Sequence, residues 1–281
     1  MMLRAGLIRQ HAAGAYSMLP MAWTVIRKIM DIIREEMEAI GCLEFQLPAL
    51  TPGDLWTRSG RWVTFGDDMF RFKDRKGRDM CLAPTHEEVF TEIAANDIRS
   101  YRDMPQMWYQ IQTKFRDEVR PRSGLLRVRQ FFMKDAYSFD SSPEGLDRSY
   151  SFQREAYLKI FKRCGLDVSV VKASSGAMGG RDCEEFMLLS QSGDDEIVHC
   201  PVCGYAANQE VAESKVEKVA GTKQDIVKTH TPDKRTIDEV SAFLGVEPSS
   251  LVKSLVYAVE DGYAFVLVRG DHQVNDGKLE A

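Results

Sequence analysis

Apolar residues recur every three or four positions between residues 22 and 40, with charged residues between them. From residue 43 to residue 47 the spacing changes to two, and Pro48 ends the run. Side chains three or four apart share a helix face, whereas alternate side chains share a strand face. The pattern therefore predicts a long amphipathic helix over 22–40 that ends at Gly41, followed by a half-buried strand over 43–47.

Two further alternating runs predict strands, the first from Met107 to Glu118 and the second from Leu126 onward. The segment between them is an arginine-bearing hairpin loop. Because alternate side chains point to the same side of a strand, we expect five chemically distinctive residues on one surface of this hairpin. They are Arg116, Glu118, Arg127, Phe131 and Asp135.

Two more helices begin at polar residues that suit a helix N-terminus. Thr85 is predicted to cap a helix that runs to about Asn96, with Glu88 as its capping-box partner. Ser142, which is followed by proline, is predicted to cap a helix that ends at Cys164.

The last part of the chain begins with a polar stretch. Residues 215–234 are rich in Lys, Glu, Asp and Thr and poor in apolar side chains, which indicates a boundary. We therefore expect a mixed α/β (α+β) domain over residues 1–214 and a second, partial α/β domain over residues 215–281. The second is predicted to contain a helix over 236–244 and strands over 251–259 and 262–269.

The composition narrows the class of protein. Of 281 residues, 44% are apolar and 28% are charged, as in a soluble globular protein. No apolar run approaches the roughly 20 residues that span a bilayer, and the N-terminus does not read as a signal peptide, so we expect a cytoplasmic protein without a membrane role. The net charge of −5 argues against a protein that coats nucleic acid, but it allows a local basic site.

The six cysteines do not predict a disulfide framework, because most are scattered without a pairing pattern. Only Cys200 and Cys203 have the spacing of metal ligands, and His199 is the one nearby candidate for a third. A closed zinc site needs four ligands. We therefore expect no metal here, and a reduced, ligand-free turn.

The predicted hairpin surface has the chemistry of a nucleotide site. Guanidinium groups suit phosphate oxygens, an aromatic face suits a purine, and a carboxylate can accept a hydrogen bond from an exocyclic amine. The alternative is a charged hairpin whose arginines pair with acids on a solvated face. The residues alone leave both interpretations open.

Several short segments of the sequence resemble those of one family. FRDE with the arginine loop resembles motif 2 of class II aminoacyl-tRNA synthetases, and the helix and strand that end at Pro48 resemble motif 1. LRAGLIRQ, APTHEEV, YQIQTKFRDEVRPR, FFMKDAYSF and CGYAAN are similar to bacterial-type prolyl-tRNA synthetases. The resemblance covers nearly the whole chain. It implies an antiparallel class II sheet flanked by helices, followed by the start of an editing insertion domain.

The resemblance also implies roles for the residues of the hairpin. Arg116 would hold the ATP α-phosphate and act in catalysis, Glu118 would contact the adenine amino group, and Phe131 would stack on adenine. Arg127 would be a second nucleotide or proline contact.

Other positions would bind the amino acid and the tRNA. Thr85 and Glu87 match an element that binds the proline imino nitrogen, and Asp135 would complete that pocket. Arg120 matches a position that reads the tRNA acceptor stem. Lys253, in SLVKSLV, matches an editing-domain word, although a solvated lysine at a strand end is the alternative.

The implied activity is that of a proline–tRNA ligase, with ATP and Mg²⁺. It activates proline to prolyl-adenylate and transfers the prolyl group to tRNA(Pro). Motif 1 implies a homodimer through its helix and strand. The editing insertion hydrolyses mischarged alanyl-tRNA(Pro) in this family.

The sequence also departs from the family pattern. It has no counterpart of motif 3 or of an anticodon-binding domain, so the chain is expected to be a fragment with uncertain activity of its own. Cys183-Glu184 stands where the family commonly has Ser-His, which bears on proline affinity. One alternative is a non-catalytic RNA-binding or dimerisation remnant. Another is a synthetase for threonine, serine or histidine, which the Thr85/Glu87 element disfavours.

Overall fold

The structure is a computed structural model of the chain. It describes residues 1–122, 124–174, 183–191, 193, 195–213, 225–259, 262–275 and 278–279. Its internal contacts divide the chain into two compact units, Met1–Val168 and Ser169–Ala281, and each is described by itself. The boundary expected between residues 214 and 215 lies outside the described residues.

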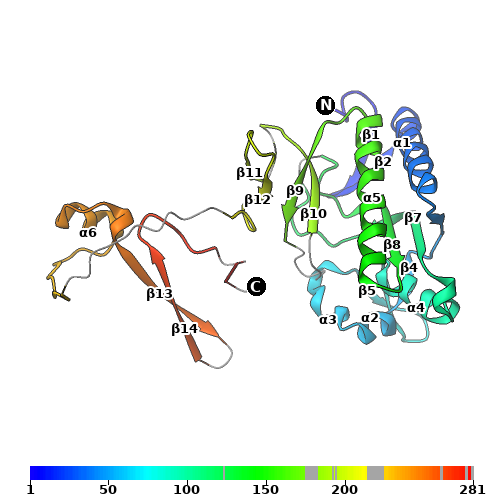
Figure 1. Cartoon of the computed structure of the whole chain (residues 1–281). Helices are drawn as coiled ribbons and strands as arrows, with labels where there is room; N and C mark the ends of the chain where they lie inside the picture. Colours follow the sequence, from blue (N-terminus) through cyan, green and yellow to red (C-terminus); the bar gives the residue numbers. More distant parts are fainter. Residues whose placement is uncertain are drawn as a thin grey trace. The chain divides into compact units, whose positions relative to one another are not determined.

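The centre of the first unit is a three-stranded sheet (Figure 1). Strands β7 (Gln106–Phe115) and β8 (Gln130–Phe139) pair antiparallel along their whole length. Strand β3 (Leu43–Glu44) runs parallel to β7 on its other edge. The strand predicted over 43–47 is therefore shorter than expected, because the Leu47 backbone N–H donates to the Gln110 side chain at 3.2 Å rather than continuing the ladder.

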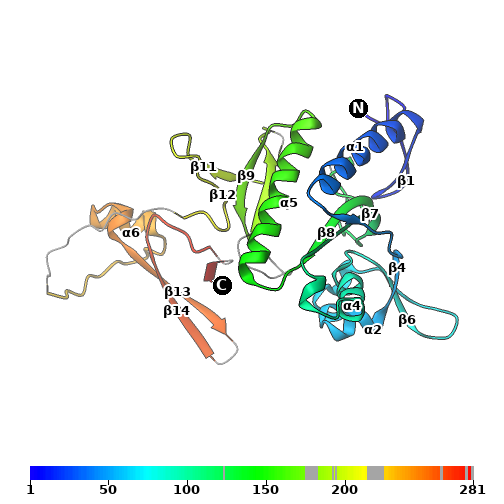
Figure 2. The same ribbon diagram turned by 45° about the vertical axis from the view of Figure 1, so that its right-hand side comes forward.

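Two long helices cover one face of this sheet; they lie next to each other in Figure 1, and Figure 2 shows their axes at an angle to each other. They are α1 (Pro20–Ala39) and α5 (Pro143–Arg163). Met37 of α1 and Ala156 of α5 pack with Tyr109 of β7 in one buried cluster. Both helices confirm their predictions.

The opposite face carries a second apolar core around Trp56, Phe90 and Trp108. Its rings stack on one another, with 4.6 Å between the ring centroids of Phe90 and Tyr137. This core fills the end of the face that holds Trp108 and Tyr137, and Gln110, Lys114 and Asp135 lie further along β7 and β8. Its elements are β4 (Leu50–Pro52), α2 (Gly53–Arg58), α3 (Arg61–Thr64), η1 (Gly66–Asp68), β5 (Arg71–Lys73), β6 (Asp79–Leu82), α4 (Glu87–Asp97) and η2 (Tyr101–Asp103).

An N-terminal hairpin lies against the loop between β7 and β8. It consists of β1 (Ile8–Ala12) and β2 (Ala15–Met18). Gly14 at its turn has φ +74°, and a Cβ there would lie 2.8 Å from the Arg129 backbone nitrogen. A glycine is required because only it combines this dihedral with so close an approach. The Gly14 carbonyl accepts a hydrogen bond from Arg129 N–H at 2.9 Å, which fixes one end of the loop.

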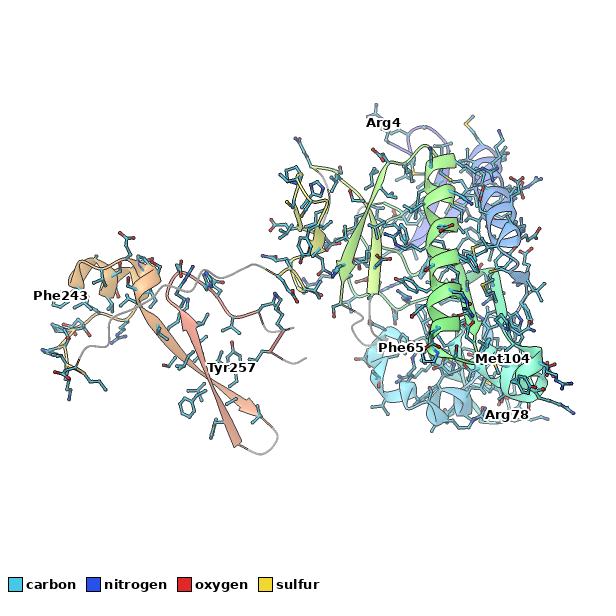
Figure 3. All side chains as sticks on the ribbon, in the orientation of Figure 1. Arg4, Phe65, Arg78, Met104, Phe243 and Tyr257 are labelled. Carbon is cyan, nitrogen blue, oxygen red and sulfur yellow. The ribbon has the colours of Figure 1, made fainter. Side chains whose placement is uncertain are left out.

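The second unit contains two separate sheets. One has the order β10-β9-β12-β11, with β11 antiparallel and β9 parallel to β12. The other is the antiparallel hairpin β13-β14, from which Tyr257 projects (Figure 3). The elements are β9 (Val168–Ala173), β10 (Cys183–Leu188), β11 (Ile197–His199), β12 (Ala206–Asn208), α6 (Ile237–Leu244), η4 (Pro248–Ser250), β13 (Val252–Val259) and β14 (Gly262–Arg269).

Within the described residues, no helix combines the length and the apolar character that crossing a membrane requires.

Candidate functional site

The register of β7 and β8 brings the predicted side chains onto one face. Lys114 pairs with Phe131, and Gln110 pairs with Asp135. Directly opposed residues of an antiparallel pair project to the same side of the sheet. The guanidinium carbon of Arg116 lies 5.5 Å from the centre of the Phe131 ring. The shared face predicted for Arg116, Phe131 and Asp135 is therefore confirmed.

The predicted strand lengths are wrong at the hairpin end. The first strand stops at Phe115 rather than at Glu118. The Arg116 N–H still reaches the Arg129 carbonyl at 3.0 Å, but Asp117 N–H turns to the Asp68 carbonyl at 2.8 Å. The second strand begins at Gln130 rather than at Leu126. Its start is set by the bonds of the Arg129 segment to the N-terminal hairpin.

Because Arg127 precedes the second strand, alternation along that strand does not place its side chain on the face of the site. Arg127 lies in the loop, in an isolated bridge with Arg122. Its Nε is 3.9 Å from Glu118 Oε2, the outer limit of an ion pair. The other carboxylate oxygen of Glu118 accepts the Arg120 backbone N–H at 3.0 Å. Glu118 thus contacts both Arg120 and Arg127 of the loop, while the Arg120 side chain stays exposed.

Thr85 and Glu87 lie at the other end of the same face, beside Tyr137. The Thr85 hydroxyl donates its one hydrogen to Glu87 Oε2. The Tyr137 hydroxyl donates its one hydrogen to Asp135 Oδ2 at 2.9 Å. The two hydroxyls approach within 3.3 Å of each other. Burial raises the pKa of Tyr137, which keeps it a neutral donor.

Asp135 lies beneath this surface, with 8% of the residue exposed. Its Oδ2 accepts from Lys114 Nζ at 2.9 Å, Gln110 Nε2 at 3.1 Å and Tyr137. Its Oδ1 is buried and has no hydrogen-bond partner among the described residues. Asp135 therefore holds Lys114, Gln110 and Tyr137 in position, since all its described hydrogen bonds are to these side chains of the face.

His86 completes the buried cluster. Its Nε2 lies 3.0 Å from the Pro48 carbonyl, which can only accept, so Nε2 carries the hydrogen. Its Nδ1 then accepts from Lys114 Nζ. Burial lowers the pKa of His86, and the charge of Lys114 lowers it further. Burial also lowers the pKa of Lys114, against the attraction of Asp135.

The predicted cap of the helix at Thr85 is wrong. Helix α4 begins at Glu87, and its N-cap residue is His86, which makes no side-chain capping bond. Thr85 does not cap because its hydroxyl is engaged with Glu87. Glu88 does not close a capping box because its carboxylate is bound by Ser59 and Arg61 instead.

Arg61 is the residue that holds Glu88. It lies 3.2 Å from Glu88 Oε1 and 3.3 Å from Glu87 Oε2, and Ser59 Oγ donates to Glu88 Oε1 at 2.9 Å. Its guanidinium packs over the Phe65 ring at 5.0 Å. A stacked arginine between two carboxylates fixes the rim of the site beside Glu87.

Comparison with known proteins identifies the family. The tRNA synthetase class II core domain (G, H, P, S and T) matches residues 70–231, more than half of the chain. The chain belongs to the class II aminoacyl-tRNA synthetases. An aminoacyl-tRNA editing domain matches residues 231–281 of this synthetase chain.

Curated relatives of this class II synthetase include proline–tRNA ligases. One from Caldicellulosiruptor saccharolyticus is 51% identical over 282 residues, which covers 100% of this chain and 49% of that protein. One from Dehalococcoides mccartyi is 49% identical over 281 residues, with the same coverage of 100% and 49%. The chain thus spans about half the length of these relatives.

Solved structures support the same fold. A Giardia lamblia prolyl-tRNA synthetase in complex with prolyl-adenylate has a TM-score of 0.57 at 22% identity, covering 61% of this chain and 36% of that one. The RNA-binding domain of a Cryptosporidium parvum threonyl-tRNA synthetase has a TM-score of 0.57 at 24% identity, covering 62% and 44%. At these identities the likeness concerns the fold alone.

Three residues of the synthetase face had no role in the sequence-based prediction. Lys114 lies two residues before Arg116, and Tyr137 lies two residues after Asp135. Alternation along the strands therefore places both on the face, but it does not show which hydrogen bonds they make. His86 stands between Thr85 and Glu87, and no sequence signal showed that it would point inward. Burial decides its role, and burial depends on distant segments.

The remaining predicted positions lie in the second unit. Lys253 lies on the partly buried side of β13, paired with Val268 of β14. Cys183 begins β10, and burial raises the pKa of its thiol. Across the described ranges, no three His, Cys, Asp or Glu side chains converge as a metal site.

Proposed function

We propose that this chain forms the proline-binding and ATP-binding face of a proline–tRNA ligase. The observation that carries the proposal is the single face on which a guanidinium lies over an aromatic ring at one end and a hydrogen-bonded carboxylate lies at the other. Identity of about half to proline–tRNA ligases over the whole chain supports proline as the amino acid.

The Arg116 end suits the nucleotide. The exposed Arg116 guanidinium can fork onto α-phosphate oxygens, and the Phe131 ring offers a surface for adenine. Glu118 would accept from the adenine amino group, and Arg127 beside it would be a second nucleotide or proline contact. Arg116 covers the Phe131 ring in this structure, so ATP binding requires its guanidinium to move toward the phosphate.

The Glu87 end suits the cationic imino group of proline. The Glu87 side chain is 30% exposed, and its Oε2 is held by Thr85 and Arg61. A carboxylate fixed in this way is a preorganised acceptor for a charged N–H donor. Asp135 supports the pocket from below through Tyr137, which also touches Thr85.

The proposed chemistry follows from the two ends. A proline carboxylate oxygen attacks the α-phosphorus, the bond to the pyrophosphate oxygen breaks, and Arg116 stabilises charge on the α-phosphate oxygens. The terminal ribose hydroxyl of tRNA(Pro) then attacks the prolyl carbonyl, the bond to the phosphate oxygen breaks, and AMP leaves. Because no acidic cluster of three ligands exists among the described residues, Mg²⁺ would bind through the phosphates of ATP, whose charge it neutralises.

The other proposed partners use surfaces outside this face. Arg120, whose side chain is exposed, would contact the tRNA acceptor stem, and Lys253 belongs to the segment that matches an editing domain. The helix α1 exposes Trp23 and Ile29, and β3 exposes Leu43, which suits a homodimer interface. We place this ligase in the cytoplasm.

Calorimetric titration with non-hydrolysable aminoacyl-adenylate analogues tests the proposal. The prolyl analogue should bind at least about tenfold more tightly than the threonyl and seryl analogues, in line with the discrimination that buried polar contacts provide. Arg116→Ala should weaken it by about 10- to 150-fold, the range for a lost hydrogen bond to a charged group. Arg75→Ala, in an exposed turn, should bind like the unaltered chain.

Two results would contradict the proposal. Equal affinity for the threonyl analogue would favour a synthetase for another amino acid. No binding by a chain shown to be folded would favour a non-catalytic RNA-binding or dimerisation protein.

A further inference from the structure

Two cysteines stand on one tight turn between β11 and β12. The Cys200 N–H donates to the Tyr205 carbonyl at 2.8 Å, and Gly204 N–H donates to the Cys200 carbonyl at 3.0 Å. The Gly204–Cys200 bond spans four residues, as in one turn of a helix, and residues three apart in such a turn have Cα atoms about 5 Å apart. Disulfides need Cα atoms roughly 4.4–6.8 Å apart. The backbone thus presents Cys200 and Cys203 in the geometry of a pair that can be linked.

The turn also points hydrogen-bond donors at one of the two sulfur atoms. The backbone N–H groups of Cys203 and Val202 donate to Cys200, and they lower the pKa of its thiol. Donors directed at a sulfur stabilise the thiolate, which is the nucleophilic form. Cys203 is exposed beside it, so a small reagent has access to the pair.

Three of the other four cysteines differ in environment. Burial raises the pKa of Cys42 to about 11, and it raises the pKa of Cys81 as well. Cys183 is also raised, by burial and by nearby glutamates. Neutral, shielded thiols react slowly.

A metal does not account for the pair. In the part of the chain that the structure describes, no third Cys, His, Asp or Glu joins these two to form a group of three. Structural zinc needs four ligands, and a two-sulfur site leaves half of the coordination unfilled.

We propose that Cys200 and Cys203 form a redox-active dithiol that reacts with low-molecular-weight disulfides, with Cys200 attacking first. The Cys200 thiolate attacks one sulfur of glutathione disulfide, the S–S bond breaks, and one glutathione leaves as a thiolate that takes up a proton. Cys203 loses its proton to solvent and attacks the Cys200 sulfur, which releases the second glutathione. The protein gives up two hydrogens, and the oxidant becomes two thiols.

The test treats the reduced chain with glutathione disulfide and maps its peptides by mass spectrometry over time. The unaltered chain should lose two hydrogens and join Cys200 to Cys203. Cys203→Ser should accumulate one glutathione on Cys200, because the resolving thiol is gone. Cys164→Ser, at a cysteine outside the turn, should react like the unaltered chain.

Cys200→Ser should take up glutathione at Cys203 more slowly than Cys203→Ser takes it up at Cys200. The rate ratio should be about threefold, because a larger thiolate fraction at Cys200 is only partly offset by lower nucleophilicity. Circular dichroism confirms that both variants stay folded. Equal rates, or glutathione appearing first at another cysteine, would overturn the proposal. A bound metal would overturn it as well. That result would be one equivalent of zinc in the chain as purified, lost in Cys200→Ser or Cys203→Ser and kept in the other variants.

Discussion

Lys114 and Asp135 form a buried ion pair, and removing one partner alone should destabilise the fold strongly. Lys114 Nζ lies 2.9 Å from Asp135 Oδ2, and the two side chains are 0% and 8% exposed. The chain offers a matched pair in Lys73 and Asp79, which are 2.8 Å apart but 65% and 59% exposed. The two pairs have nearly the same distance and differ in burial, so a comparison of their variants isolates the effect of burial.

Lys114→Met should be strongly destabilising. It leaves the Asp135 carboxylate buried without its cation, although Tyr137 and Gln110 still donate to it. Breaking a buried pair from one side costs about 3–5 kcal/mol of the free energy of unfolding. Lys73→Met should cost less than about 1 kcal/mol, as exposed pairs do.

The double variant Lys114→Met with Asp135→Asn should recover at least half of the loss. It removes both charges, while the remaining carbonyl oxygen still accepts from the neighbouring donors. Its recovery also keeps the test informative if the single variant is too unstable to purify.

Tryptophan fluorescence during urea unfolding is a suitable assay. The chain has four tryptophans, and all of them lie in the unit Met1–Val168 that contains the ion pair. Trp56 and Trp108 are 0% and 5% exposed, so unfolding changes their surroundings. The reasoning is refuted if Lys114→Met loses no more stability than Lys73→Met, or if the double variant is as unstable as the single one.

Three further predictions test other parts of the account. Glu87→Gln should weaken proline binding by about 10- to 150-fold, because a charged acceptor is lost, and leave ATP binding unchanged in calorimetry; an equal loss of both would contradict the assignment. Phe131→Ala should weaken ATP binding by about 5- to 150-fold, the range for a lost aromatic stack. Phe132→Ala, on the opposite face of β8, should not. Because the pKa of His86 is lowered in the folded chain, the unfolded chain binds a proton that the folded chain does not, so stability should fall as pH drops through the ordinary value of 6.5. The slope from His86 is at most about 1.4 kcal/mol per pH unit. Urea titrations at pH 7.5 to 5.5 measure this slope. His86→Asn should flatten it, whereas His11→Asn, at an exposed histidine, should keep it. An unchanged slope in His86→Asn would contradict the claim that His86 is buried in its neutral form.

Much of the fold follows from short-range chemistry and was predictable. Gly41 ends α1 with φ +86°, a conformation that glycine adopts readily. Ser142 caps α5 by accepting the Gly145 N–H at 3.2 Å. Thr236 and Glu239 form the capping box of α6. Such signals lie within a few residues of the element they control, so the sequence displays them.

The face of the site was predictable for a similar reason, because strand parity depends only on alternation. Its details were not. The end of β7 is set by the Asp68 carbonyl, and the approach of the N-terminal hairpin depends on Gly14. Thr85 and His86 turn inward because β7 and β8 offer them partners. These contacts join segments far apart in the chain, and no local pattern encodes them.

The most direct test of the central claim is a crystal structure of the chain with a non-hydrolysable prolyl-adenylate analogue. The account predicts the adenine ring against Phe131, the phosphate substitute within hydrogen-bond distance of Arg116, and the imino nitrogen at the Glu87 carboxylate. An analogue bound elsewhere, or bound at this face with its proline away from Thr85 and Glu87, would contradict it.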